Sequence, residues 1–192
     1  MIADAREQAE RWCSALWGDR QGWALTAVGR SPQMSSGRFR HACLDQFSYQ
    51  WPDDRDRLLS ELLPLADSCD VYVAPLLRSA PNRRNADSEP LDGQYVWLDA
   101  DEWDEERERV LAGYEAPVLR VQSGGAPGRM HLYLDVGELR PGHQIARMAQ
   151  LLSEDLRTDT YGGANKLLRL PGTKNHKPRL AGQPAAAVIL LP

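Results

Sequence analysis

The order of the secondary-structure elements expected after residue 93 restricts the fold of this chain more than any other feature. Apolar residues there alternate between the two-residue repeat of strands and the 3.6-residue repeat of helices. The expected order is strand 94–100, helix 103–113, strand 117–122, strand 129–136, helix 141–156, and strands near 166–170 and 186–191. This is βαββαβ with one additional strand. It predicts a mainly antiparallel sheet with both helices on one face.

Alternation within these strands assigns side chains to the two faces of the sheet, because successive side chains point in opposite directions. The apolar residues expected to face the helices are Val96, Leu98, Leu119, Val121, Met130, Leu132, Leu134, Leu168 and Leu170. The residues expected on the other, open face are Trp97, Asp99, Asp101, His131, Tyr133 and Arg169. The fold class is therefore α+β, with a core like the RNA-recognition motif and carboxylates, an imidazole and a guanidinium on its open face.

Residues 1–88 are expected to form an N-terminal α/β module, and residues 89–192 the core. A loop over 78–93 separates them, since this stretch lacks apolar periodicity and contains Pro and Gly. Before the loop, helices are expected over 5–16 and around 58–63, and short strands around 23–28 and 71–74. With 192 residues, the two parts together suit one domain, which is possibly a fragment of a longer protein.

The charge and composition narrow the classes of function. The net charge is −4, so any nucleic-acid contact must be local. Residues 140–192 carry eight Lys or Arg and three acidic residues, a local excess of five positive charges. No apolar stretch is long enough to span a bilayer, and the three cysteines are widely spaced without a Cys-x-x-Cys pair. These features predict a cytoplasmic protein with no membrane partner.

Asp99 and Asp101 close the apolar strand and are expected to project from the same face. Two neighbouring carboxylates repel each other unless a cation compensates, and such hard oxygen ligands favour Mg²⁺ or Mn²⁺. The alternative is a strand that runs into an acidic helix start, with Asp101 or Asp104 as the N-cap. Both interpretations fit the pair alone.

The segment from Ser123 to His131 contains three glycines, which let backbone N–H groups approach a phosphate closely. His131 is placed to donate a hydrogen bond to a triphosphate. The alternatives are an ordinary connection between two strands and a structural histidine. A further segment, 159–177, combines Asp159 with a dense run of cations. Within it, Arg169 lies in an apolar strand, so an anionic partner is expected beside it.

Together these segments resemble the motifs of the archaeo-eukaryotic primase superfamily, in its primase-polymerase branch of plasmid, phage and bacterial replication proteins. The run Trp97 to Asp101 is similar to its first motif, an apolar strand that ends in two acidic residues. The run Ser123 to His131 is similar to its second motif. Asp159 to Arg169 is similar to the third, and the continuation Arg-Leu-Pro-Gly-Thr-x-Asn-x-Lys is specific to this branch. The resemblance covers about residues 69–180.

The resemblance implies a template-directed DNA primase-polymerase that transfers a nucleotidyl group from a dNTP or NTP to a 3′-hydroxyl on single-stranded DNA. It implies two divalent ions, Mg²⁺ or Mn²⁺, held by Asp99, Asp101 and Asp159, with Asp155 as the alternative third carboxylate. The residues implied in nucleotide binding are Ser123, Gly125, Arg129, His131, Arg169, Lys174 and Lys177. Those implied in DNA binding are Arg78, Arg83, Arg84 and His176.

The implied partners are a DNA template, a primer and the nucleotide, with a helicase or a helical priming domain in a full-length protein. An alternative from another class is a noncatalytic module that binds single strands by stacking bases on Trp97 and Tyr133. The acidic residues on that face argue against it, because they repel phosphates unless a metal is present.

Overall fold

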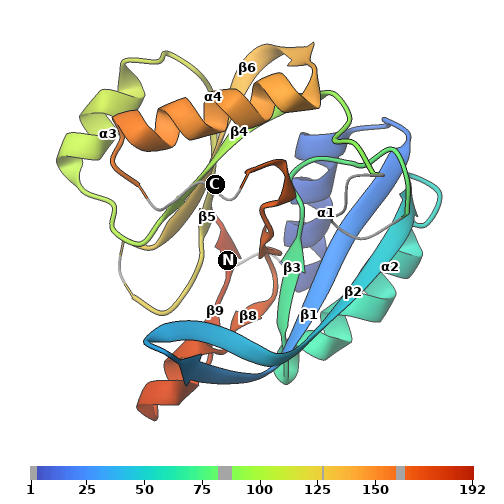
Figure 1. The fold of residues 1–192 in the computed structure, drawn as a ribbon, viewed down its shortest axis with the longest axis vertical. Coiled ribbons are helices and arrows are strands. Elements are labelled where there is room, and N and C mark those ends of the chain that lie inside the picture. The colour runs from blue at the N-terminus through green and yellow to red at the C-terminus, as the bar shows by residue number, and fades with distance from the viewer. Residues whose placement is uncertain (1–3, 82–87, 127, 159–162) are drawn as a thin grey trace.

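The computed structural model describes residues 4–81, 88–126, 128–158 and 163–192, and two four-stranded sheets dominate it (Figure 1). The first sheet has the strand order β2-β1-β3-β7, and every neighbouring pair is antiparallel. Its strands are β1 (Gly22–Ser35), β2 (Arg38–Trp51), β3 (Asp70–Val73) and β7 (Leu168–Arg169). Helices α1 (Ala5–Trp17) and α2 (Arg55–Leu62) and the 3₁₀ turn η1 (Leu63–Asp67) belong to the same part of the chain.

Strands β1 and β2 form a hairpin that the sequence analysis did not anticipate. Its turn consists of Ser36 and Gly37, since Ser35 pairs with Arg38. Both turn residues have positive φ, 51° and 72°, as two-residue hairpin turns of type I′ require. The hairpin extends beyond the two short strands of its sheet as a long projecting arm (Figure 1).

The second sheet has the order β10-β5-β6-β4 and confirms the predicted α+β class with a mainly antiparallel core. Its strands are β4 (Gly93–Ala100), β5 (Val118–Gln122), β6 (Met130–Arg140) and β10 (Ile189–Leu190). Helices α3 (Glu105–Ala112) and α4 (Gly142–Asp155) lie on one face (Figure 1). The carboxylate of Asp104 caps α3 by accepting from the Arg107 backbone N–H at 2.9 Å, so the N-cap is Asp104 rather than Asp101.

The register of β4, β5 and β6 determines which side chains share a face, because directly opposed residues of an antiparallel pair point the same way. Trp97 pairs with Tyr133 and Asp99 with His131, as the alternation predicted. Leu119 and Val121, however, pair with Tyr133 and His131. The prediction that these two residues face the helices was therefore wrong. Arg120 faces them instead, in an ion pair with Glu108 of α3 at 2.6 Å.

The face opposite α3 and α4 is not open where Trp97 and Tyr133 lie. Trp97 is 2% exposed and Tyr133 is fully buried. The ring of Trp12, on α1, meets the Tyr133 ring edge-on at a centroid distance of 5.6 Å. Trp17 of the same helix packs on Trp51 of β2 at 5.0 Å. Helix α1 thus joins the two sheets into one core, and the alternative of bases stacked on Trp97 and Tyr133 is excluded because both rings are buried.

The segment 166–170 also lies elsewhere than predicted. Its strand β7 pairs with β3 of the first sheet, Arg169 opposite Tyr72 and Leu168 opposite Val73, and β10 takes the outer position next to β5. The physical reason is the charge of Arg169, whose guanidinium donates to the buried carboxylate of Asp70 on β3 at 3.0 Å. The division of the chain into residues 1–88 and 89–192 stays a prediction.

The remaining elements are short and connect the two sheets. They are the 3₁₀ turns η2 (Gly163–Asn165) and η3 (Lys177–Ala181) and the paired strands β8 (Lys174–Asn175) and β9 (Ala186–Ala187). The three cysteines are free thiols. Across the part of the chain that the structure describes, no helix combines the length and the apolar character that a bilayer crossing requires.

Candidate functional site

The candidate site lies at the end of β4, on the face away from α3 and α4. Asp99 is the next-to-last residue of β4, and its Oδ1 lies 3.6 Å from Nε2 of His131 on the neighbouring strand. Its other oxygen, Oδ2, lies 2.6 Å from the ammonium of Lys166. Asp101 follows the strand, and its Oδ1 is 3.3 Å from Nε of Arg129. Asp99, His131 and Lys166 therefore form one cluster, and Asp101, two residues after Asp99, is paired separately with Arg129.

The surroundings of Asp99 keep it ionised. Burial raises the pKa of its carboxyl, but His131, Lys166 and Arg169 outweigh burial, and the pKa lies below its ordinary value. At His131, in contrast, burial has the larger effect, and it lowers the pKa of the imidazole to about 4 although the negative charge of Asp99 opposes it. His131 is consequently a neutral imidazole at neutral pH, able to donate one hydrogen bond and accept another.

A second cluster surrounds Asp70, at the start of β3, whose side chain has no exposed surface. Its Oδ1 accepts from Nε of Arg169 at 3.0 Å and from the backbone N–H of His176 at 3.0 Å. His41 Nε2 lies 3.6 Å from the other oxygen. The anionic partner that the sequence analysis expected for Arg169 is thus Asp70, a residue outside the predicted motifs.

Tyr72 connects this second cluster to the hairpin. Its hydroxyl lies 3.2 Å from Nη2 of Arg169 and 3.0 Å from Nε2 of His41. The guanidinium of Arg169 also lies over the Tyr72 ring, 5.2 Å from its centre. Asp70 and Tyr72 therefore both hold the guanidinium of Arg169. This guanidinium lies close enough to Asp99 to lower the pKa of that carboxyl.

The glycine-containing segment from Ser123 to His131 is held by hydrogen bonds from the segment that follows Arg169. Nδ2 of Asn175, which is 1% exposed, donates to the carbonyls of Ser123 at 3.2 Å and of Gly124 at 3.1 Å. Gly124 and Gly125 have positive φ, 78° and 97°, which glycine adopts without strain. Asn175 thus fixes the backbone of the loop that was predicted to bind phosphate.

Several predicted site residues are occupied by contacts inside the protein. Ser123 is 5% exposed and His176 is fully buried, with its Nε2 2.9 Å from the Ala66 carbonyl. Arg78 is 3% exposed and donates to the carbonyls of Ser88 and Ala164. Lys174 is half exposed and pairs with Asp67 at 2.7 Å. Lys177 places its ammonium over the ring of Phe39 at 5.7 Å.

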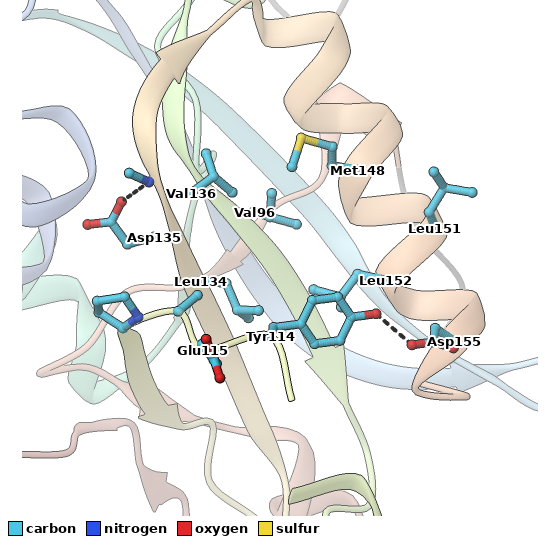
Figure 2. A pocket seen from close by; sticks show the side chains of 13 residues that line it. Val96, Tyr114, Glu115, Leu134, Asp135, Val136, Met148, Leu151, Leu152 and Asp155 are labelled. Atoms are coloured by element: carbon cyan, nitrogen blue, oxygen red, sulfur yellow. Dashed lines mark hydrogen bonds between the residues drawn. The ribbon is translucent and has the colours of Figure 1, made fainter. Parts of the chain in front are cut away.

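The position of Asp155 separates it from the candidate site. It lies at the end of α4, where its carboxylate accepts from the Tyr114 hydroxyl at 2.5 Å. Figure 2 shows both residues in a groove of about 750 Å³ on the helix side of the second sheet. Asp99 projects from the other side. Asp159, Arg83 and Arg84 lie outside the described residues, so Asp159 as the third carboxylate stays a prediction.

The donor chemistry at Asp99 and Asp101 fits a divalent cation, since carboxylates are the ligands that Mg²⁺ and Mn²⁺ favour. Within the described residues, no three His, Cys, Asp or Glu side chains are grouped closely enough to hold a metal ion. The third predicted ligand is among the residues not described. Lys166 supplies the positive charge that Asp99 needs in this structure.

Sequence reasoning missed two residues of these clusters, Asp70 and Lys166. A signal existed for Asp70, because a carboxylate directly before the apolar run Val71 to Val73 is costly to bury without a cation. Lys166 had no comparable signal, since a lysine three residues before an arginine is ordinary in a basic segment. Only the fold brings it to Asp99.

The fold of two antiparallel sheets joined by α1 is similar to that of solved primase catalytic domains. The primase RepB' has this fold, with a TM-score of 0.64 and 16% identity over 98% of this chain and 56% of that one. The RepB' catalytic domain in complex with initiator DNA gives a TM-score of 0.60 at 15% identity, over 99% and 85% of the two chains. The resemblance predicted from the motifs is confirmed at the level of the fold.

A polymerase domain has a related fold. It is that of Mycobacterium tuberculosis Ligase D in complex with DNA, with a TM-score of 0.51 and 13% identity over 96% of this chain and 80% of that one. No protein-family model and no curated protein sequence matches the chain. This chain spans little more than half of the longer RepB' chain.

Proposed function

We propose that this chain is a DNA primase-polymerase that extends a primer on single-stranded DNA with dNTPs or NTPs. The observation that carries the proposal is the pairing of Asp99 with His131 at the end of β4, beside Asp101, on a fold shared with primase and polymerase domains. The DNA in two of those structures supports DNA as a partner.

In this proposal Asp99, Asp101 and Asp159 hold the divalent ions. Such ions would activate the primer 3′-hydroxyl and neutralise charge on the triphosphate. The neutral His131 donates a hydrogen bond to a phosphate oxygen, and Arg169, fixed by Asp70 and Tyr72, presents positive charge to it. The backbone around Gly125, with Ser123 and Arg129, closes over the phosphates. Lys174 and Lys177 add positive charge at the outer edge.

Nucleotide incorporation tests the proposal directly. Primed and unprimed single-stranded DNA would be incubated with all dNTPs or all NTPs over a titration of Mg²⁺ and Mn²⁺. We expect metal-dependent products from the wild type and a loss of about 1,000-fold or more in Asp101→Ala, because metal ions contribute several kcal/mol to such reactions. Glu115→Gln, an exposed carboxylate of the groove on the helix side of the sheet, is the matched control and should retain activity.

Two results would contradict the proposal. One is normal incorporation by the Asp99→Ala, Asp101→Ala double variant. The other is no product from the wild type under any condition, together with DNA binding that does not depend on metal. The second result would favour a noncatalytic module that binds single strands by a surface other than Trp97 and Tyr133, which are buried.

A further inference from the structure

The groove of Figure 2 lies on the helix side of the second sheet, across from Asp99, and takes no part in the proposed function. It has a volume of about 750 Å³ and runs between α4 and β6 (Figure 2). We call it the helix-side groove. Its apolar lining includes Val96 and Leu134 of the sheet and Met148, Leu151 and Leu152 of α4, and the segment 114–117 lines it as well.

Large apolar side chains of the helix-side groove are open to solvent. Val96 and Leu134 are buried and belong to the hydrophobic core, so the floor of the groove is apolar. Above this floor, Leu151 is 47% exposed and Tyr114 is 46% exposed. Exposed apolar side chains that share one hollow, unlike single ones scattered over a surface, mark a site of interaction.

The helix-side groove also carries negative charge. Glu115 and Asp155 are exposed and Asp135 is partly buried, and all three line it. None of the described residues in its lining is Lys or Arg, and the sequence of the undescribed residues 159–162 contains neither. The groups that donate hydrogen bonds to Asp135 and Asp155 are an amide, a backbone N–H and a hydroxyl, which carry no charge. An occupant with positive charges beside an apolar surface is therefore complementary to the groove.

The elements around the helix-side groove favour a helix over a strand as the occupant. Strand β6 pairs with β5 on one side and with β4 on the other, so its backbone groups are bonded within the sheet. A strand binds by adding to a free sheet edge, whereas a helix binds through side chains alone. Helix α4 presents lining residues at intervals of three and four, the ridge on which a second helix packs. These residues are Met148, Leu151, Leu152 and Asp155.

We propose that the helix-side groove binds an amphipathic helix of a partner protein, with an apolar stripe of leucine-like side chains flanked by Lys or Arg. The apolar stripe packs on Met148 and Leu151, and the cations pair with the carboxylates at the rim. The inference goes beyond nucleotidyl transfer and does not depend on it, because the groove and Asp99 lie on opposite sides of the sheet. A partner bound there holds the domain and leaves the Asp99 side free.

The first experiment measures binding of a fluorescent peptide to the protein by anisotropy. The probe has about 15 residues, the length at which an isolated helix becomes marginally stable in water. It carries leucine at every third or fourth position and lysine and alanine elsewhere, and a second probe has glutamate in place of each lysine. We expect the glutamate probe to bind at least about tenfold more weakly than the lysine probe, since like charges repel across an interface. Added salt should weaken binding of the lysine probe.

Variants of the protein locate the bound probe. Leu151→Asp should bind the lysine probe about 30-fold more weakly, as expected for loss of a central apolar contact. Leu180→Asp is its matched control, because Leu180 is an exposed leucine of η3 outside the groove. Asp155→Lys should weaken binding about tenfold through charge repulsion. Asp53→Lys, which changes the net charge equally at an exposed position before α2, should bind as the wild type.

Two further measurements identify the kind of occupant and the state of the variants. Circular dichroism of the complex should show more helix than the separate spectra of protein and lysine probe together. The same method confirms that Leu151→Asp and Asp155→Lys are folded, as their exposed positions predict. If Asp155→Lys is unstable, Asp155→Asn removes the charge and keeps an oxygen that can accept from the Tyr114 hydroxyl.

The outcomes separate this inference from the proposed function. Failure of the lysine probe to bind, equal binding of the two probes, or wild-type affinity in Leu151→Asp would overturn it, as would a bound probe that gains no helix. Self-association of the wild type in sedimentation, lost in Leu151→Asp, would assign the groove to a second copy of this chain instead. Absence of nucleotide incorporation by the wild type would refute the proposed function alone.

Discussion

Asp70 and Asp99 are two carboxylates on neighbouring sheets that differ in their exposure to solvent and in the groups that neutralise them. Asp70 has no exposed surface and receives two hydrogen bonds, one from the guanidinium of Arg169 and one from a backbone N–H. Asp99 keeps 29% of its side chain exposed and is paired with the flexible ammonium of Lys166. Asp70 is buried and held at Oδ1 by two donors, whereas Asp99 is partly exposed and paired at Oδ2 with a lysine side chain.

This difference indicates separate roles. A buried carboxylate held by two fixed donors organises the residues around it, here Arg169 and the segment that contains His176. A partly exposed carboxylate with one mobile counter-ion can exchange that ion for another cation. The comparison predicts that Asp70 matters chiefly for stability and Asp99 chiefly for ligand binding. Three variants test it.

The largest effect on stability is expected at Asp70. Asp70→Asn leaves the buried guanidinium of Arg169 without its anion, and breaking one side of a buried ion pair costs about 3 kcal/mol or more. Urea unfolding should show this loss with an unchanged slope. Asp67→Asn is the control, because Asp67 is an exposed partner of Lys174, and its unfolding curve should stay close to that of the wild type. Equal losses of unfolding free energy in Asp70→Asn and Asp67→Asn would contradict the stabilising role assigned to Asp70.

A smaller effect on stability is expected for Asp99→Asn, about 1 kcal/mol, because solvent screens this partly exposed pair. The pKa of Asp99 lies below its ordinary value in the folded protein. Its stabilising contribution is therefore present at neutral pH and is lost as the pH falls through that lowered pKa. Unfolding curves at pH 7 and pH 3 should show the difference from wild type shrinking at the lower pH. A loss as large as that of Asp70→Asn would break the comparison.

The smallest effect is expected in the groove on the helix side. Tyr114→Phe removes the hydrogen bond to Asp155, and both side chains are exposed, so the cost should be about 0.5 kcal/mol. Nucleotide and Mn²⁺ binding should stay at wild-type values, since the groove lies across the sheet from Asp99. Thermal unfolding and the Mn²⁺ titration measure the two quantities. A changed Mn²⁺ affinity would show that the two faces of the sheet are coupled.

The sequence predicted the part of the candidate site that depends on strand periodicity. Asp99 and His131 lie opposite each other because both occupy the same face of two strands that pair in the predicted order. The helices α1, α3 and α4 were also predicted to within three residues at each end. Regular apolar repeats mark α1 and α4, and an N-cap aspartate followed by an acidic first turn marks α3. The catalytic function itself stays a proposal.

What the sequence did not predict depends on contacts between distant segments. The partner of Arg169 was Asp70, 99 residues away, and the cover over Tyr133 was Trp12 of the first helix. Neither contact leaves a local pattern in the chain. The hairpin could have been found, because Ser36-Gly37 is a turn dipeptide, but the two strands beside it lack regular alternation.

The place of β7 in the first sheet has a consequence for synthesis of the protein. Strand β3 precedes its neighbour β7 by almost a hundred residues, and Gln8 accepts a hydrogen bond from Leu190, 182 residues later. While the chain emerges from the ribosome, one edge of β3 has no partner and Asp70 has no counter-charge. Such long-range pairing makes folding slow and exposes the nascent edge to aggregation. Emergence of the segment that contains β7 and Arg169 should therefore be the event that commits the two sheets to their native pairing.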